Sequence, residues 1–217
     1  MMTEPRSLPL SGSEPAGSCH ACAFFLDPEE EYRALLPFSR RCAHLGEKCL
    51  HFVDPLMHTQ RIRRLAEAGI DTGGGGPAGR LEIRTWDDAY LHHRCFNQDS
   101  MLSLIEQTLR DGRNSFGRAR LWANMEWALE GLPGCDDLIE YESRLNPLIE
   151  QHNDIVVCVY ALANYGASMV MDILRTHPMV VVGESVEENP FYVPTDRFLE
   201  DLKQRRAPRP GLHSASE

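Results

Sequence analysis

The chain has 217 residues, of which 42% are apolar and 25% are charged, so it is long enough to bury the core of one α/β domain. Its net charge of −10 argues against a surface of clustered Lys and Arg that binds nucleic acid directly. The longest apolar runs, residues 155–162 and 179–182, are far shorter than the roughly 20 residues of a membrane-spanning helix, which excludes a membrane protein of that kind.

Both ends of the chain are predicted to lie outside the folded domain. Residues 1–18 mix Ser, Pro, Gly and Glu without periodicity, which is typical of disorder, and residues 205–217 form a polar, proline-containing tail that we expect to be flexible. The predicted domain therefore covers residues 19–204. Seven cysteines form an odd set with no signal peptide before them, so we expect free thiols in a cytoplasmic protein.

Strand-like and helix-like segments alternate from residue 19 onward. The apolar run 19–26 is followed by Asp27-Pro28-Glu29-Glu30-Glu31, in which Asp27 can cap a helix and the three glutamates favour its first turn. Residues 48–53 form a second predicted strand, stopped by Asp54-Pro55. The helix after it is predicted to expose three arginines to solvent: Arg61, Arg63 and Arg64.

The same alternation continues to the end of the predicted domain. Further strands are expected at residues 81–86, 118–123, 155–160 and 179–182, with helices at 100–110, 136–150 and 167–175 between them. Nearly continuous apolar runs such as 155–160 are typical of strands that helices cover on both sides. The pattern predicts an α/β fold of three layers, a mostly parallel sheet with helices on both faces.

Ligands of open α/β sheets bind at the carboxyl edge of the strands, where Asn124, Glu126 and Trp127 follow the strand at 118–123. A carboxylate, an amide and an indole can supply polar and stacking contacts. The alternative is that Trp127 is a core residue and Glu126 a solvated turn residue, since large aromatics are usually buried. With residues near the other strand ends, the candidate ligand-binding set is His20, Phe25, Asp54, Trp86, Tyr90, Asn124, Glu126, Trp127 and Tyr160.

A metal site is a second interpretation. His20 and Cys22 share one face of the first strand, Cys49 and His51 share one face of the second, and neighbouring strands would bring the four together around a metal or a haem. The spacing is not a conventional zinc motif, and buried thiols are common core residues, so the default is a protein without a cofactor. His20 itself is either a core histidine or a hydrogen-bonding group of a sensor pocket.

Six segments, in order, resemble the MEDS family, the DcmR-type sensory domain. They are Cys-His-Ala-Cys-Ala-Phe-Phe-Leu-Asp-Pro-Glu-Glu-Glu-Tyr, Glu-Lys-Cys-Leu-His-Phe-Val-Asp-Pro, Trp-Ala-Asn-Met-Glu-Trp-Ala-Leu, Val-Val-Cys-Val-Tyr, Asp-Ile-Leu-Arg-Thr-His-Pro-Met-Val-Val-Val-Gly and Glu-Asn-Pro-Phe-Tyr-Val-Pro. The resemblance covers about residues 19–202. It implies a ligand-sensing module, related to the RecA/KaiC-like ATPase fold, of the kind found in prokaryotic transcriptional regulators and signalling proteins.

The resemblance also shows where the residues that an ATPase needs would lie in this chain. The ATPase relatives place a phosphate loop ending in Gly-Lys-Thr or Gly-Lys-Ser after the first strand, where this chain reads Leu26-Asp27-Pro28-Glu29-Glu30-Glu31. Four acids would repel a triphosphate, and no lysine is present to bind it. Asp54 and Glu126 lie near the positions where such relatives keep acids, but without the loop we expect no ATP hydrolysis.

The sequence therefore predicts a sensory or regulatory domain and not an enzyme. We expect it to bind a small effector at the carboxyl edge and to signal through a separate signalling or transcription partner protein, or through self-association as a homo-oligomer. Two alternatives remain at this stage. One is a residual nucleotide phosphohydrolase that uses Asp54 and Glu126, and the other is a metal- or haem-linked redox sensor that uses His20, Cys22, Cys49 and His51.

Overall fold

A computed structural model describes residues 8–9, 17–73, 76, 79–91 and 94–207. Most of the two predicted tails lies outside these residues. Within the predicted N-terminal tail, however, Leu8–Pro9 form strand β1, which pairs antiparallel with Ser185–Val186. At the other end the last helix extends to Arg206, so the domain includes two residues that the sequence assigned to the C-terminal tail.

The described residues form one sheet of eight strands in the order β1-β8-β7-β2-β6-β5-β3-β4. Strands β2, β3, β4, β5, β6 and β7 run parallel, while β8 and β1 add an antiparallel edge. The strands after β1 are β2 (Cys19–Phe25), β3 (Lys48–Val53), β4 (Leu81–Thr85), β5 (Ala119–Asn124), β6 (Ile155–Ala161), β7 (Met179–Val182) and β8 (Ser185–Glu188). The carboxyl ends of β2, β6, β5 and β3 therefore lie side by side at one edge.

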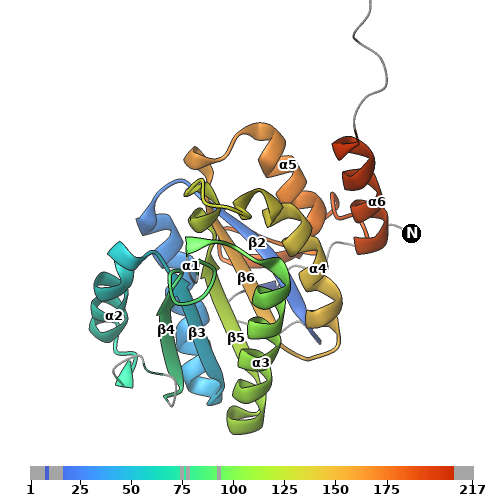
Figure 1. Ribbon diagram of the computed structural model, residues 1–217. Helices are drawn as coiled ribbons and strands as arrows, with labels where there is room; N and C mark the ends of the chain where they lie inside the picture. The colour runs from blue at the N-terminus through green and yellow to red at the C-terminus, as the bar shows by residue number, and fades with distance from the viewer. Residues whose placement is uncertain (1–7, 10–16, 74–75, 77–78, 92–93, 208–217) are drawn as a thin grey trace, which may run out of the picture.

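Helices cover both faces of the sheet, as Figure 1 shows. Helices α1 (Pro28–Leu45) and α2 (His58–Glu67) pack on one face. Helices α3 (Gln98–Phe116), α4 (Leu138–Glu150), α5 (Ala167–Thr176) and α6 (Thr195–Arg206) pack on the other. Among the helices of the described residues, none combines the length and apolar composition that a bilayer crossing requires. The three layers predicted from the sequence are thus observed.

Local sequence signals set the start and end of α1. The Asp27 carboxylate accepts a hydrogen bond from the Glu30 backbone N–H at 2.8 Å, and the Glu30 carboxylate accepts one from the Leu26 N–H at 2.7 Å. Asp27 thus caps an N–H group that the first turn leaves open, while Glu30 binds the N–H of the residue before the cap, one position earlier than in a standard capping box. Gly46 ends the helix in the left-handed conformation, with φ of 75°.

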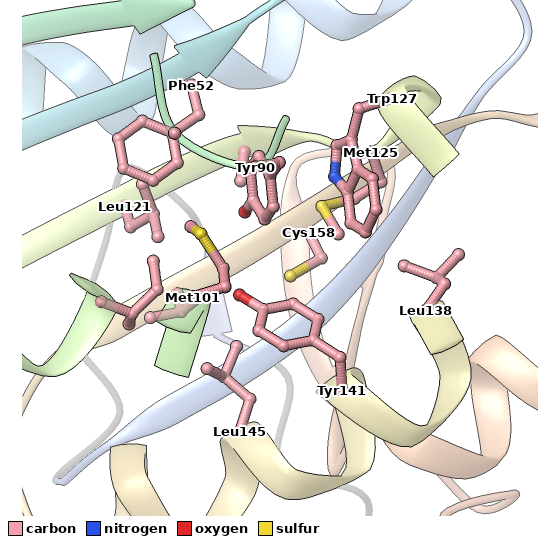
Figure 2. Close-up of a cluster of buried hydrophobic side chains, with 14 of the residues drawn as sticks. Phe52, Tyr90, Met101, Leu121, Met125, Trp127, Leu138, Tyr141, Leu145 and Cys158 are labelled. Carbon is pink, nitrogen blue, oxygen red and sulfur yellow. The ribbon is translucent and has the colours of Figure 1, made fainter. Parts of the chain in front are cut away.

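Alternation along each strand divides the core into two layers. On β2, Cys19, Ala21 and Ala23 face α1, while Cys22 faces the layer of α3 and α4. The larger layer contains an aromatic group in which Tyr90 stacks on Trp127 with ring centroids 4.7 Å apart. Figure 2 shows Trp127, Tyr90 and Tyr141 gathered in this core beneath the sheet edge.

Candidate functional site

A pocket of about 260 Å³ lies at the carboxyl edge of the sheet. We call it the carboxyl-edge pocket, and its lining residues come from the ends of β2, β3, β5 and β6 and from α1 and α2: Phe25, Leu26, Asp27, Pro28, Glu31, Tyr32, Asp54, Met57, Arg61, Asn124, Glu126, Val159, Ala161, Ala163 and Asn164. Four predicted site residues, Phe25, Asp54, Asn124 and Glu126, are among them. The pocket combines an apolar wall with a small number of convergent polar groups, which is typical of small-molecule sites.

Glu31 is the centre of the polar network on the α1 side of this pocket. One carboxylate oxygen, Oε1, accepts hydrogen bonds from Arg61 Nη2 at 2.7 Å, from Trp122 Nε1 at 3.1 Å and from Asn124 Nδ2 at 3.3 Å. Arg61 Nη2 also donates to Asn124 Oδ1 at 3.1 Å. The network joins two helices to the end of β5 and fixes the floor of the pocket.

Arg61 is buried, with 3% of its side chain exposed, so the prediction that it faces solvent is wrong. It lies one turn before the buried Leu65, which places it on the same inward face of α2. Its guanidinium carbon lies 5.1 Å from the centre of the Tyr32 ring. Its Nε and Nη1 groups are buried beside the pocket without a hydrogen-bond acceptor among the described residues.

Glu126 is the polar group of the pocket with the most perturbed acidity. Its Oε1 atom accepts a hydrogen bond from the Ala161 backbone N–H at 2.6 Å. Burial raises the pKa of the Glu126 carboxyl to about 7, and the negative charges of Glu31 and Asp54 add to this effect, while the hydrogen bond from Ala161 opposes it. Near neutral pH this carboxyl therefore exists both as an acid and as a carboxylate.

The charge balance of the pocket is acidic. Four carboxyl groups line it, and Arg61 is the single basic residue among its lining. The Asp27 and Asp54 carboxylates each accept a hydrogen bond from a backbone N–H at 2.8 Å. The α1 N-terminus, whose dipole would otherwise attract anions, carries acids at all three positions that follow Pro28. An anionic ligand at the start of α1 would thus meet like charge.

The five other predicted site residues do not line this pocket. Trp127, which follows β5, and Tyr90, which follows β4, are core residues: their rings stack on each other in the layer that contains Tyr141 of α4. Trp86 lines a separate hollow beyond β3, which shares only Asp54 with the pocket. His20 and Tyr160 lie on the opposite face of the sheet from Glu31, because they occupy alternate strand positions that face α4.

His20 belongs to a second polar cluster, which the sequence did not predict, and Tyr160 lies beside that cluster. We call it the buried histidine cluster: His20, Glu142, Cys158 and His177. All four side chains are buried, and one ligand atom from each lies within 4.8 Å of the other three. Tyr160 donates a hydrogen bond to Glu142 Oε1 at 2.9 Å. Burial lowers the pKa of His20, and the neighbouring His177 lowers it further.

The metal set predicted from the sequence does not assemble. Strands β2 and β3 are separated by β6 and β5, so the expectation that they are neighbours is wrong. Cys49 and His51 face α1, where His51 Nε2 lies 3.4 Å from Cys49 Sγ and 3.2 Å from Ser39 Oγ. His20 and Cys22 face the other layer. The neighbouring Cys42 and His51 side chains lower the pKa of Cys49, although burial opposes this shift.

Because the pKa of Glu126 is raised in the folded state, we expect the free energy of unfolding to depend on pH. Between its ordinary value of 4.5 and its folded value of about 7, the unfolded chain releases a proton that the folded chain keeps, so stability falls as pH rises through this window. Glu126→Gln cannot ionise and keeps an oxygen for the Ala161 N–H. We expect the variant to match the wild type near pH 4.5 and to be more stable by about 1–3 kcal/mol at pH 8.

Urea denaturation at pH 5, 6.5 and 8 measures this difference. Glu130→Gln is the matched control, because Glu130 is an exposed acid of the same turn and lies outside the carboxyl-edge pocket. An equal effect of both substitutions at every pH would contradict the assignment of the perturbed carboxyl to Glu126.

Comparison with solved structures shows the fold of the domain. A KaiC-like protein, PH0186, from the hyperthermophilic archaeon Pyrococcus horikoshii OT3 matches with a TM-score of 0.55 and 16% identity, over 78% of this chain and 73% of that one. The flagellar accessory protein FlaH from Methanocaldococcus jannaschii matches with a TM-score of 0.52 and 11% identity, over 82% and 78% of the two chains. The RecA-like α/β fold predicted from the sequence is therefore confirmed.

Comparison with known sequences shows the family. The search among curated proteins found no match. The family model described as MEDS, the MEthanogen/methylotroph, DcmR Sensory domain, matches residues 19–178, which is most of the domain. The description of this family as a sensory domain suggests a regulatory sensing role. The resemblance noted in the sequence is confirmed, and the chain belongs to the MEDS family.

Proposed function

We propose that this domain is a ligand-responsive sensor whose small effector binds in the carboxyl-edge pocket. The observation that carries the proposal is the composition of that pocket: it occupies the sheet edge where α/β proteins bind ligands, and it presents apolar walls together with four carboxyl groups and one paired guanidinium. Such a surface favours a compact organic molecule with an apolar body and one or more hydrogen-bond donors, either neutral or cationic.

The polar groups of the pocket define what such an effector would contact. The Glu126 carboxylate can accept from a ligand donor, and Asp54 retains a second carboxylate oxygen beside the one that binds the Leu56 N–H. The Phe25 ring and the side chains of Met57 and Val159 supply apolar area. A pocket of this size accommodates a molecule smaller than a nucleotide.

Binding would be transmitted through the segments that frame the pocket. Ala163 and Asn164 lie after β6, and Met57 lies between β3 and α2, so an effector would contact two segments that leave the sheet at different strands. A ligand shifts a conformational equilibrium only when it binds one state better than another. We propose that the favoured state is recognised by a separate signalling or transcription partner or by a second copy of the chain, without ATP hydrolysis.

A thermal-shift screen tests the proposal. Small amines, small alcohols, apolar organic molecules, metal ions and Mg-ATP would each be added to the purified chain. An effector at 100 times its Kd adds about 2.7 kcal/mol of stability, which corresponds to a rise in Tm of about 5–10 °C for a chain of this length. We expect a small organic molecule to produce this rise, and Mg-ATP to produce none.

Variants assign the shift to the pocket. Glu126→Gln should abolish or strongly reduce the rise in Tm for a donor-bearing effector, whereas Glu130→Gln should keep it. A rise that is equal in both variants would place the effector elsewhere. Stabilisation by Mg-ATP, with release of inorganic phosphate that Glu126→Gln abolishes, would favour the nucleotide phosphohydrolase instead.

A further inference from the structure

We propose that the buried histidine cluster, His20, Glu142, Cys158 and His177, binds one divalent transition-metal ion, with zinc as the best match. The site is distinct from the carboxyl-edge pocket, because it lies on the other face of the sheet. His20 comes from β2, Cys158 from β6, Glu142 from α4 and His177 from the link between α5 and β7. The ion would therefore join two strands of the sheet to α4 and to the link that follows α5.

The hydrogen bonds around the cluster fix which ring nitrogens face its centre. His20 Nδ1 lies 2.8 Å from Asn146 Oδ1, and the orientation of that amide is set because its Nδ2 donates to Ser143 O and Thr176 O at 3.2 and 2.8 Å. His177 Nδ1 lies 2.8 Å from the carbonyl oxygen of Ile173. Both Nδ1 atoms thus face acceptors and carry the proton, which in a neutral ring leaves Nε2 with a free lone pair.

Four electron-pair donors then converge on one point. Glu142 Oε2 lies 3.3 Å from His20 Nε2 and 3.3 Å from His177 Nε2, and Cys158 Sγ lies 3.5 Å from both Glu142 Oε2 and His20 Nε2. His177 Nε2 is buried without a hydrogen-bond partner among the described residues. Lone pairs of neutral imidazoles facing a buried carboxylate repel each other unless a metal ion or a proton on one of the rings lies between them.

Four of the six distances between the ligand atoms match a tetrahedral site, and the other two are within 4.8 Å. Zinc bonds of about 2.0–2.3 Å to nitrogen, oxygen and sulfur place neighbouring ligand atoms roughly 3.3–3.7 Å apart. The two nitrogen-to-oxygen distances of 3.3 Å lie at the lower end of this range. Two imidazoles, a carboxylate and a thiolate are the donors that zinc accepts, and four protein ligands make a closed, structural site.

The surrounding groups complete the site. Each histidine has a fixed partner on its outer nitrogen, and the outer oxygen of Glu142 accepts from Tyr160, which leaves Oε2 as a single ligand atom. Such supporting bonds are a regular feature of metal sites. Because the four ligand atoms lie within 4.8 Å of one another, the space holds one ion and not a haem.

Metal analysis of the full chain tests the proposal directly. The chain would be produced in zinc-supplemented medium and then in cobalt-supplemented minimal medium, passed through a chelating column and measured by inductively coupled plasma mass spectrometry. We expect one ion per chain, and for cobalt the visible bands of a tetrahedral ion together with a thiolate-to-cobalt charge-transfer band. A wild-type chain that contains no metal from either medium, and whose histidines titrate as two ordinary protons by NMR, would overturn the proposal.

Matched variants locate the ion. Cys158→Ala and His177→Gln should lose it, whereas Cys49→Ala and His51→Gln, which change buried residues of the same types on the opposite face of the sheet, should keep it. Loss from the second pair alone would overturn the assignment. Asn146→Ala removes a positioning residue, so it should keep the cobalt spectrum and weaken the affinity, measured against a chromophoric chelator, by about 10–100-fold.

Discussion

Replacing Glu31 with alanine is expected to destabilise the folded domain by about 3–5 kcal/mol, because the Arg61 guanidinium would stay buried without its carboxylate partner. Trp122 Nε1 would lose its hydrogen-bond acceptor in the same step. Urea denaturation, with the midpoint and the slope both fitted, measures the change. The effector-dependent rise in Tm should also disappear, since the floor of the carboxyl-edge pocket depends on this network.

Glu29→Ala is the matched control for this prediction. Glu29 lies two residues earlier in the same helical turn and binds Arg64, on the same helix as Arg61, through two hydrogen bonds of 2.5 and 2.7 Å. Its side chain is 71% exposed, so its removal should leave the unfolding midpoint unchanged within error. Equal destabilisation by the two substitutions would show that the loss of stability in Glu31→Ala does not come from the burial of the Glu31–Arg61 pair.

Replacing Trp127 with alanine is expected to cost about 3–5 kcal/mol of stability, as truncations of large buried aromatics do. The indole is fully buried, and its ring centroid lies 4.7 Å from that of Tyr90 and 4.3 Å from that of Phe96. Figure 2 shows it directed into the core and away from the sheet edge. Thermal and urea denaturation measure the loss.

Leu129→Ala is the control for Trp127→Ala, because it truncates a side chain of the same short helix that is not buried in the core. Leu129 is 47% exposed and lies two residues after Trp127 in the same short helix, so its truncation should change stability little. In chains that remain folded, Trp127→Ala should bind an effector of the carboxyl-edge pocket with unchanged affinity. A folded Trp127→Ala protein of wild-type stability with weakened effector binding would restore the interpretation of Trp127 as a site residue.

Periodicity and capping signals predicted the fold well. The acids after Pro28, the continuous apolar strands and the presence of the helices between them follow from local rules. The helix predicted at residues 100–110 extends to Phe116, and the edge strands β1 and β8 were not predicted. The order of strands does not follow from local rules. It was the unpredicted insertion of β6 and β5 between β2 and β3 that separated the cysteine and histidine pairs expected to form a metal site.

Of the nine residues predicted from strand position, four line the carboxyl-edge pocket and five do not. Phe25, Asp54 and Asn124 line the pocket because they end or directly follow parallel strands. Tyr160 also lies near a strand end, but its side chain points to the other face, and the path of the chain after β5 decided the place of Trp127. The positions of both side chains depend on tertiary structure, which the periodicity of the sequence does not predict.

A sequence signal for the residues that were missed does exist. Glu31, Arg61 and Glu142 are charged residues that fall on the apolar stripe of their helices: Glu31 lies one turn before Leu35, Arg61 one turn before Leu65, and Glu142 three residues before Leu145. A charged residue on the inward stripe has to be paired or to bind a ligand, because an isolated buried charge is too costly. His177 had no such signal, since a histidine before a proline usually marks a turn.

We propose above all that the carboxyl edge of this RecA-like sheet binds a small donor-bearing molecule and not a nucleotide. The most direct test is NMR of the ¹⁵N-labelled chain, following the Ala161 backbone amide and the Asn124 side-chain amide, both of which adjoin the pocket. If the effector binds in the carboxyl-edge pocket, the molecule found by thermal shift should move these two signals, and Mg-ATP should leave them unchanged. Saturable shifts of these signals and of the Glu29–Glu31 amides on addition of Mg-ATP would contradict it.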